Sequence, residues 1–301
     1  MATKAPQSRS STRQEQAPSP ESQDVATVAE ERTGLPVPVS VTDDDEFGAH
    51  AGAGMENVTA ADMLVPRLSV LQQLSPQLNN RKGEYLEGAT QGKICDVGVG
   101  EYWDSIYFVP CYFEKLWLEW APRSSGKGLV AIHNDPAILE KCTRNEKNQP
   151  MNGPNLVAVT TQIYGFNLTA GARRSFISLA STQLKSSRKW MALATGEKLK
   201  RADGSEFQPP LFYRSYLLDS TMTSNAEGDW FLLRVQRAES LPELTRSDGP
   251  FPNLNWRSIK EDCVKFTESL RKGEARADTS TLGEELRAES GAAVDSEEGR
   301  M

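Results

Sequence analysis

Aromatic side chains are missing from both ends of this chain apart from Phe47, and all the others lie between residues 57 and 272. The segments 1–56 and 273–301 are rich in small, polar and acidic residues. Such segments cannot bury enough apolar surface to offset the entropy lost when a chain becomes ordered. We therefore expect two disordered tails around one domain of residues 57–272, which is long enough to enclose a sizeable hydrophobic core.

The charge divides along the same boundaries. The 301 residues carry a formal net charge of −7. Residues 1–56 hold 4 basic and 10 acidic residues and residues 273–301 hold 3 and 8, which leaves 27 basic and 23 acidic residues in the domain. A mildly basic domain thus stands between two acidic tails. Such tails keep a protein soluble or, alternatively, compete for a basic groove or dock a partner.

Several classes of protein are excluded. No run of 18 apolar residues exists to span a membrane, and no apolar signal segment follows the first residues. The four cysteines are far apart and form no CxxC pair, so neither a disulfide framework nor a zinc site is expected. These features predict a protein of the cytoplasm, without a metal.

Motifs for catalysis are also missing. The loop Arg123–Gly128 contains glycine and lysine but lacks the order of a phosphate-binding P-loop, and neither GxSxG nor GxGxxG occurs. The chain has only two histidines, His50 and His133, which give little basis for a histidine-based catalytic site. We expect no catalytic residue, no cofactor and no enzymatic activity.

The pattern of the domain is mainly that of β-strands. Hairpins are predicted from 156–168 with 174–181 and from 211–223 with 230–236, and helices are predicted at 183–194 and 256–271. A further aromatic stretch, 105–120, reads as strand, and Pro110 within it indicates an edge or a bulge. Five to seven strands, one inserted helix and one C-terminal helix predict a β-rich α+β fold, either a partly open barrel or a strongly curved antiparallel sheet.

A basic cluster at 173–201 is the best candidate for a binding site. It holds eight cations and a single acid, Glu197, and aromatic residues interleave with the cations. Single-stranded nucleic acid requires cations for its phosphates and flat side chains under its bases. Alternatively, the rings belong to the core and the cations form an ordinary solvated face. The cations are Arg173, Arg174, Lys185, Arg188, Lys189, Lys198, Lys200 and Arg201; the rings are Phe176 and Trp190, joined by Tyr164 and Phe166 of the preceding strand.

A second aromatic group lies earlier in the chain, and cations follow it in the next loop. Because strands alternate their side chains between two faces, most of these rings are expected in the core, with Trp120 buried. Arg123 and Lys127 complete the candidate nucleic-acid-binding set. The rings are Trp103, Tyr107, Tyr112, Trp117 and Trp120.

Three sequence motifs resemble those of phage-encoded single-stranded DNA-binding proteins from replication modules. They are Val65-Pro-Arg-Leu68, Leu118-Glu-Trp120 and Gln183-Leu-Lys-Ser-Ser-Arg-Lys-Trp190. The resemblance covers about residues 57–245. It implies an OB-like β-barrel that coats single strands, with the most direct role at Lys185–Trp190. The chain departs from the pattern at its end, Glu298-Gly-Arg-Met301, which lacks the terminal aromatic residue that recruits partners in such proteins.

The leading hypothesis is therefore sequence-independent binding of single-stranded DNA in phage replication or recombination, with phage or host replication proteins as further partners. One alternative is a phage structural or assembly protein whose β-domain forms homo-oligomers. Another is a regulator that binds single strands and acts through a partner protein.

Overall fold

The computed structural model describes residues 53–57, 64–225, 228–275 and 277, all within one compact unit. Most of the two predicted tails lies outside these residues. At the C-terminal end of the described chain, Ala275 is buried against the core and Ala277 bridges to Val65. Packing thus continues past residue 272, where the sequence placed the end of the domain.

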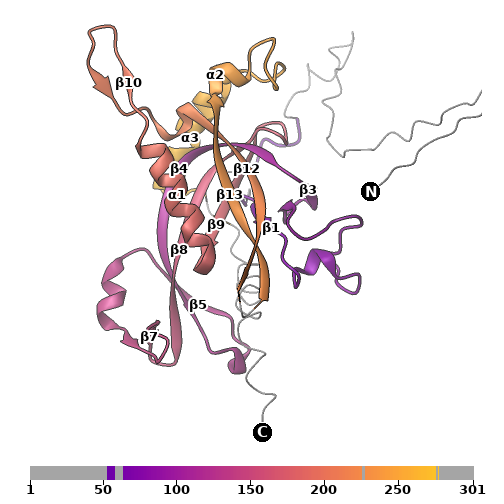
Figure 1. Ribbon diagram of the computed structural model, residues 1–301, viewed down its shortest axis with the longest axis vertical. Coiled ribbons are helices and arrows are strands. Elements are labelled where there is room, and N and C mark those ends of the chain that lie inside the picture. The colour runs from indigo at the N-terminus through magenta and orange to yellow at the C-terminus, as the bar shows by residue number, and fades with distance from the viewer. Residues whose placement is uncertain (1–52, 58–63, 226–227, 276, 278–301) are drawn as a thin grey trace, which may run out of the picture. The chain divides into compact units, whose positions relative to one another are not determined.

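A single large sheet dominates the described residues (Figure 1). Along its main path the strand order is β13-β12-β4-β8-β9-β1-β2-β3, while β5 pairs with β4, β7 with β8 and β6 with β7. The pairings are antiparallel except that of β1 with β9. The strands are β1 (Arg67–Val70), β2 (Ile94–Asp96), β3 (Glu101–Trp103), β4 (Ile106–Trp120), β5 (Leu129–His133), β6 (Thr143–Arg144), β7 (Pro150–Asn152), β8 (Asn155–Asn167), β9 (Arg173–Ala180), β12 (Arg214–Asn225) and β13 (Gly228–Ser240).

The other elements are a small hairpin and the helices. The hairpin of β10 (Leu199–Lys200) and β11 (Glu206–Phe207) forms a separate two-stranded sheet. The α-helices are α1 (Leu184–Thr195), α2 (Leu241–Leu244) and α3 (Trp256–Arg271). Short 3-10 helices are η2 (Pro76–Leu78), η3 (Arg123–Ser125), η4 (Pro136–Lys141), η5 (Ser181–Gln183) and η6 (Leu211–Tyr213).

The long strands β4 and β8 form the spine of the sheet. Their register shifts between Pro110 and Tyr112, where Pro110 lies opposite Gly165. A Cβ on Gly165 would lie 2.1 Å from the backbone oxygen of Val109 and 2.7 Å from the Phe108 ring. The bulge that Pro110 predicted is therefore present, and a glycine permits the close approach on the partner strand.

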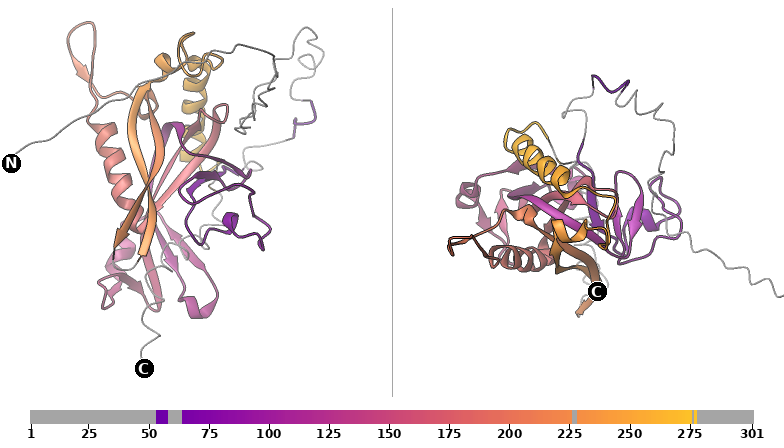
Figure 2. Two further views of the ribbon diagram at one scale, coloured as in Figure 1. Left: turned by 45° about the vertical axis from the view of Figure 1, so that its right-hand side comes forward. Right: turned by 90° about the horizontal axis from the view of Figure 1, so that it is seen from above.

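Helices cover both faces of the curled sheet, as the views in Figures 1 and 2 show. Ile163 and Ile177 face the core that includes Trp190 of α1, whereas Tyr164 and Phe176 face the core that includes Phe266 of α3. Neighbouring residues on one strand thus belong to opposite cores, as the alternation of a strand requires. The result is a β-rich, strongly curled half-barrel with a few helices, consistent with an OB-like, partly open barrel.

The long elements follow the sequence prediction, but most of the short strands were not expected. The helices predicted at 183–194 and 256–271 correspond to α1 and α3, and both predicted hairpins are present. Five to seven strands were expected, but the described residues contain more. The additional strands are only two to five residues long, too short to show a period of alternation.

Candidate nucleic-acid interface

Helix α1 positions the three cations that the sequence analysis placed at the centre of the site. Trp190 is fully buried, with its ring 5.8 Å from that of Phe108 and 5.5 Å from that of Tyr216. This contact fixes the rotation of the helix. Lys185, Arg188 and Lys189 consequently lie on the opposite, solvent-exposed side.

The charge of α1 is uncompensated. The helix contains no aspartate or glutamate. Within the described residues, Lys185, Arg188 and Lys189 form no ion pair. Lys185 lies in the first turn, where the helix macrodipole disfavours cations and favours anions, and Arg188 and Lys189 lie in the second. A bound phosphate here would be attracted both by the side chains and by the N-terminal end of the helix.

The β10–β11 hairpin continues the positive surface beyond the end of α1. Lys198, Lys200 and Arg201 are exposed. Lys198 has an acidic neighbour, with its Nζ 3.7 Å from Glu206 Oε2. The guanidinium of Arg201 lies 4.5 Å from the centre of the Phe207 ring and donates a hydrogen bond to Ser205.

These two elements together form a basic track. Figure 1 shows α1 leading directly to the hairpin that carries β10. The 12 residues of α1 rise about 18 Å at 1.5 Å per residue, so the track extends over several nucleotides of an extended strand. Its members are Lys185, Arg188, Lys189, Lys198, Lys200 and Arg201.

Two predicted cations do not belong to the track. Arg173 donates to Glu101 at 2.8 Å and lies 3.4 Å from the buried carboxylate of Asp96. The bond to Glu101 raises the pKa of Arg173, while burial raises the pKa of Asp96. Arg174 places its guanidinium 5.4 Å from the Phe266 ring, on the side covered by α3. Both side chains are half-buried and connect elements of the fold, so we do not include them in the track.

The predicted stacking platforms are also corrected. All four rings are at least 97 % buried, because helices cover both faces of the sheet. Trp190 fills the core beneath α1, and the other three rings pack around Phe266 of α3. A buried ring offers no face to a base. The residues concerned are Tyr164, Phe166, Phe176 and Trp190.

The loop candidates belong to the segment 121–155, outside α1 and the β10–β11 hairpin. Lys127 is exposed, and the side chain of Arg123 is outside the described part of the chain. Of the earlier aromatic group, Trp103, Trp117 and Trp120 are buried, so the prediction for Trp120 is confirmed. Phe207, which pairs with Arg201, was not among the candidates, because a single aromatic residue in a polar loop gives no pattern in the sequence.

The sequence reasoning also missed a polar cluster around Glu119. This buried carboxylate accepts hydrogen bonds from Asn155 Nδ2 at 2.6 Å and Asn152 Nδ2 at 3.1 Å, and lies 2.9 Å from His133 Nε2. Burial raises the pKa of Glu119, but the three hydrogen bonds outweigh it and hold the pKa below its usual range. The cluster joins β4 to β5, β7 and β8, and so stabilises the lobe.

Within the ranges that the structure describes, no three His, Cys, Asp or Glu side chains come together as a potential metal site. No helix of the described chain has both the length and the apolar character needed to cross a membrane.

The chain is similar to a family of phage proteins. The family model described as Pam3 phage gp34-like protein matches residues 31–249, which is more than half of the chain. No curated protein and no solved structure matches.

Proposed function

The chain belongs to the Pam3 phage gp34-like family, and from this phage origin and the basic track we propose that it is a non-enzymatic protein that binds single-stranded DNA. Binding takes place in the cytoplasm of the host cell, during phage replication or recombination. It is independent of sequence, because the track offers charge and not a pattern of groups that reads base edges.

One observation carries the proposal, namely three exposed cations on α1 with no acidic partner among the described residues. Cations that are held together repel one another, and neutralising them with phosphates releases counterions from the nucleic acid. The Arg201–Phe207 pair supports the proposal further. A guanidinium plane held on a ring is a surface on which an unpaired base can stack.

The test is a titration of a labelled single-stranded oligonucleotide, with a duplex control, at low and at physiological salt. Wild-type protein is compared with the variant Lys185→Glu/Arg188→Glu/Lys189→Glu. A matched control, Lys260→Glu/Lys265→Glu/Arg271→Glu, makes the same change of charge at exposed positions of α3, on the other face of the sheet.

We expect tight, salt-sensitive binding of the single strand and weak binding of the duplex. The α1 variant should lose at least about 10-fold in affinity, or about 1.4 kcal/mol, and the α3 control should lose much less. Equal losses in the two variants would mean that net charge matters and the track does not. Absence of binding at low salt would overturn the proposal.

A second candidate is a phage assembly protein that forms homo-oligomers through its β-domain. It is favoured by β5, which among the described strands pairs only with β4. Two apolar residues of β5 are exposed to solvent, with relative accessibilities of 50 % for Val130 and 43 % for Ile132. An edge strand with exposed apolar side chains is a template for pairing with another chain. A ring or filament that forms without DNA and is lost in Val130→Lys/Ile132→Lys would support this function instead.

A third candidate is a regulator that binds single strands and acts through a partner. Affinity for DNA does not distinguish it from the first proposal. A protein captured only by the DNA-bound form, and a loss of phage replication when that contact alone is removed, would support the regulator.

A further inference from the structure

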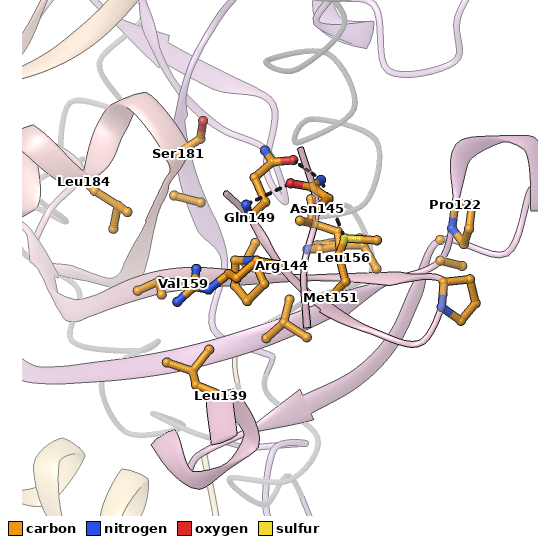
Figure 3. A pocket seen from close by; sticks show the side chains of 18 residues that line it. Pro122, Leu139, Arg144, Asn145, Gln149, Met151, Leu156, Val159, Ser181 and Leu184 are labelled. Atoms are coloured by element: carbon orange, nitrogen blue, oxygen red, sulfur yellow. Dashed lines mark hydrogen bonds between the residues drawn. The ribbon is translucent and has the colours of Figure 1, made fainter. Parts of the chain in front are cut away.

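A cavity of about 590 Å³ opens beside β8, between the β6–β7 hairpin and the beginning of α1 (Figure 3). Its volume falls within the usual range for pockets that hold small organic groups. Strand β8 forms one wall, Leu139 and Met151 form another, and Leu184 of α1 closes the side towards the helix. None of these residues belongs to the basic track.

The cavity lies where β8 lacks a neighbour on one side. Asn155 and Leu156 pair with β7, and Thr160–Asn167 pair with β9. Between them, Val157–Val159 have β4 on one side and no strand of the described chain on the other. A gap of three residues is shorter than an ordinary strand, but its free backbone groups can bond to the edge of a flat ring.

The walls combine apolar surface with positive charge. Among the described residues, Arg144 is the one charged residue that lines the cavity, and none of their carboxylates lines it. Figure 3 shows its guanidinium beside Val159. One of its nitrogens donates to the carbonyl of Asn148 at 2.9 Å. A cation on apolar walls, without an acid, fits an apolar ring attached to an anion.

The cavity also adjoins the basic track. Leu184 lines it, and Arg188 lies one turn further along the same face of α1. A group held in the cavity thus has Arg188 of the track within one helical turn of its rim.

We propose that this cavity holds a nucleobase of the bound single strand, while Arg188 contacts an adjoining phosphate. This inference rests on the proposed function and adds a site that encloses a base, since the rings predicted as platforms are buried. The base leaves water for an apolar site, and the backbone of Val157–Val159 bonds to its edge. An extended peptide is the competing occupant, but the short gap and the lone arginine favour the base.

The test compares two labelled single strands of equal length and charge. One is an oligomer of about 12 deoxythymidines, and the other is abasic. This length lies within the roughly 4–16 nucleotides that such domains typically bind. Both are titrated against wild-type protein and against two variants that fill the cavity, Val159→Phe and Met151→Phe. The matched control, Val130→Phe, makes the same change at an exposed position of β5 outside the cavity. Urea midpoints establish which variants fold.

We expect wild type and Val130→Phe to bind the thymidine strand about 10-fold more tightly than the abasic strand, which corresponds to about 1.4 kcal/mol. A filling variant that folds should bind both strands with the affinity that wild type has for the abasic strand.

Each other outcome would overturn the proposal. If wild type binds both strands equally, the track binds DNA through phosphates alone and the cavity holds no base. If both filling variants keep the preference, the base binds elsewhere. If no strand binds, the proposed function fails as well. If there is no preference but a valine-rich extended peptide binds wild type and not the filling variants, the cavity is a protein-docking site.

Discussion

The side chain of Gln72 forms a reciprocal pair of hydrogen bonds with the backbone of Phe231: its Nε2 donates to the carbonyl at 2.8 Å, and its Oε1 accepts from the N–H at 2.9 Å. Gln183 adds a bond to the same carbonyl and accepts from the N–H of Leu233, each at 2.9 Å. Strand β13 ends the main path of the sheet. Two glutamine amides therefore satisfy its edge where a closed barrel would place another strand.

Replacing Gln72 with methionine should lower the free energy of unfolding by about 1–3 kcal/mol, the usual cost of a buried donor without an acceptor. The carbonyl of Phe231 keeps its bond from Gln183, but the N–H loses its acceptor. Urea denaturation gives the stability, and hydrogen exchange should quicken at the Phe231 amide. Gln73→Met, at the exposed neighbouring residue, is the control and should be neutral. Equal effects of the two changes would contradict the role of the amide.

Gly165→Ala should destabilise the fold by at least about 2 kcal/mol, because the added Cβ would collide with the backbone oxygen of Val109 and the Phe108 ring. Relief requires the bulge at Pro110 to shift, and with it the pairing of β4 and β8. The control is Gly83→Ala, since a Cβ there meets nothing within 4 Å. Comparison of thermal or urea midpoints checks the prediction, which fails if Gly165→Ala is as stable as Gly83→Ala.

The α-helices were predictable from sequence because each buries one stripe. In α3, the buried residues Ile259, Cys263 and Phe266 follow the helical period. Val264 lies one position beyond that stripe and is 41 % exposed. Most of the short strands were not predictable, since two to five residues are too few to show a period of alternation.

The binding site could be predicted only in part. Alternation along β9 shows that Phe176 and Ile177 face opposite ways, but not that helices cover both faces. The exposure of Phe176 therefore could not be inferred. The partner of Arg173 was equally hidden, because Glu101 is 72 residues away in the chain. The cations of α1 were correctly placed on the solvent side, because the helical period alone separates them from Trp190.

Glu119→Gln should cost about 1–3 kcal/mol of stability at neutral pH, because an amide N–H₂ would then face the donors of Asn152 and Asn155. The folded pKa of Glu119 is lower than its ordinary value of 4.5, so its contribution is present above that value and is lost as the pH falls through the lowered pKa. Urea titrations at pH 7 and below pH 4 should therefore show the difference from wild type shrinking in acid.

Glu114 provides the contrast of opposite sign. Burial raises its pKa, although Tyr164 donates a hydrogen bond that opposes the rise. A raised folded pKa means that the ionised form of Glu114 is unfavourable at neutral pH, so Glu114→Gln should cost less there than Glu119→Gln. A larger loss in Glu114→Gln at pH 7 would contradict both assignments.

The dependence of DNA binding on salt provides a count of the phosphates that α1 contacts. For single strands, each neutralised phosphate adds about 0.7 to the slope of the logarithm of affinity against the logarithm of salt concentration. Replacing Lys185, Arg188 and Lys189 with alanine should therefore reduce that slope by about 2, if each contacts one phosphate. Alanine at Lys260, Lys265 and Arg271 of α3 removes the same charge and should leave the slope nearly unchanged. If the affinity of the α1 variant falls but its slope does not change, α1 affects binding without contacting the phosphates. The phosphate contacts would then lie on another surface.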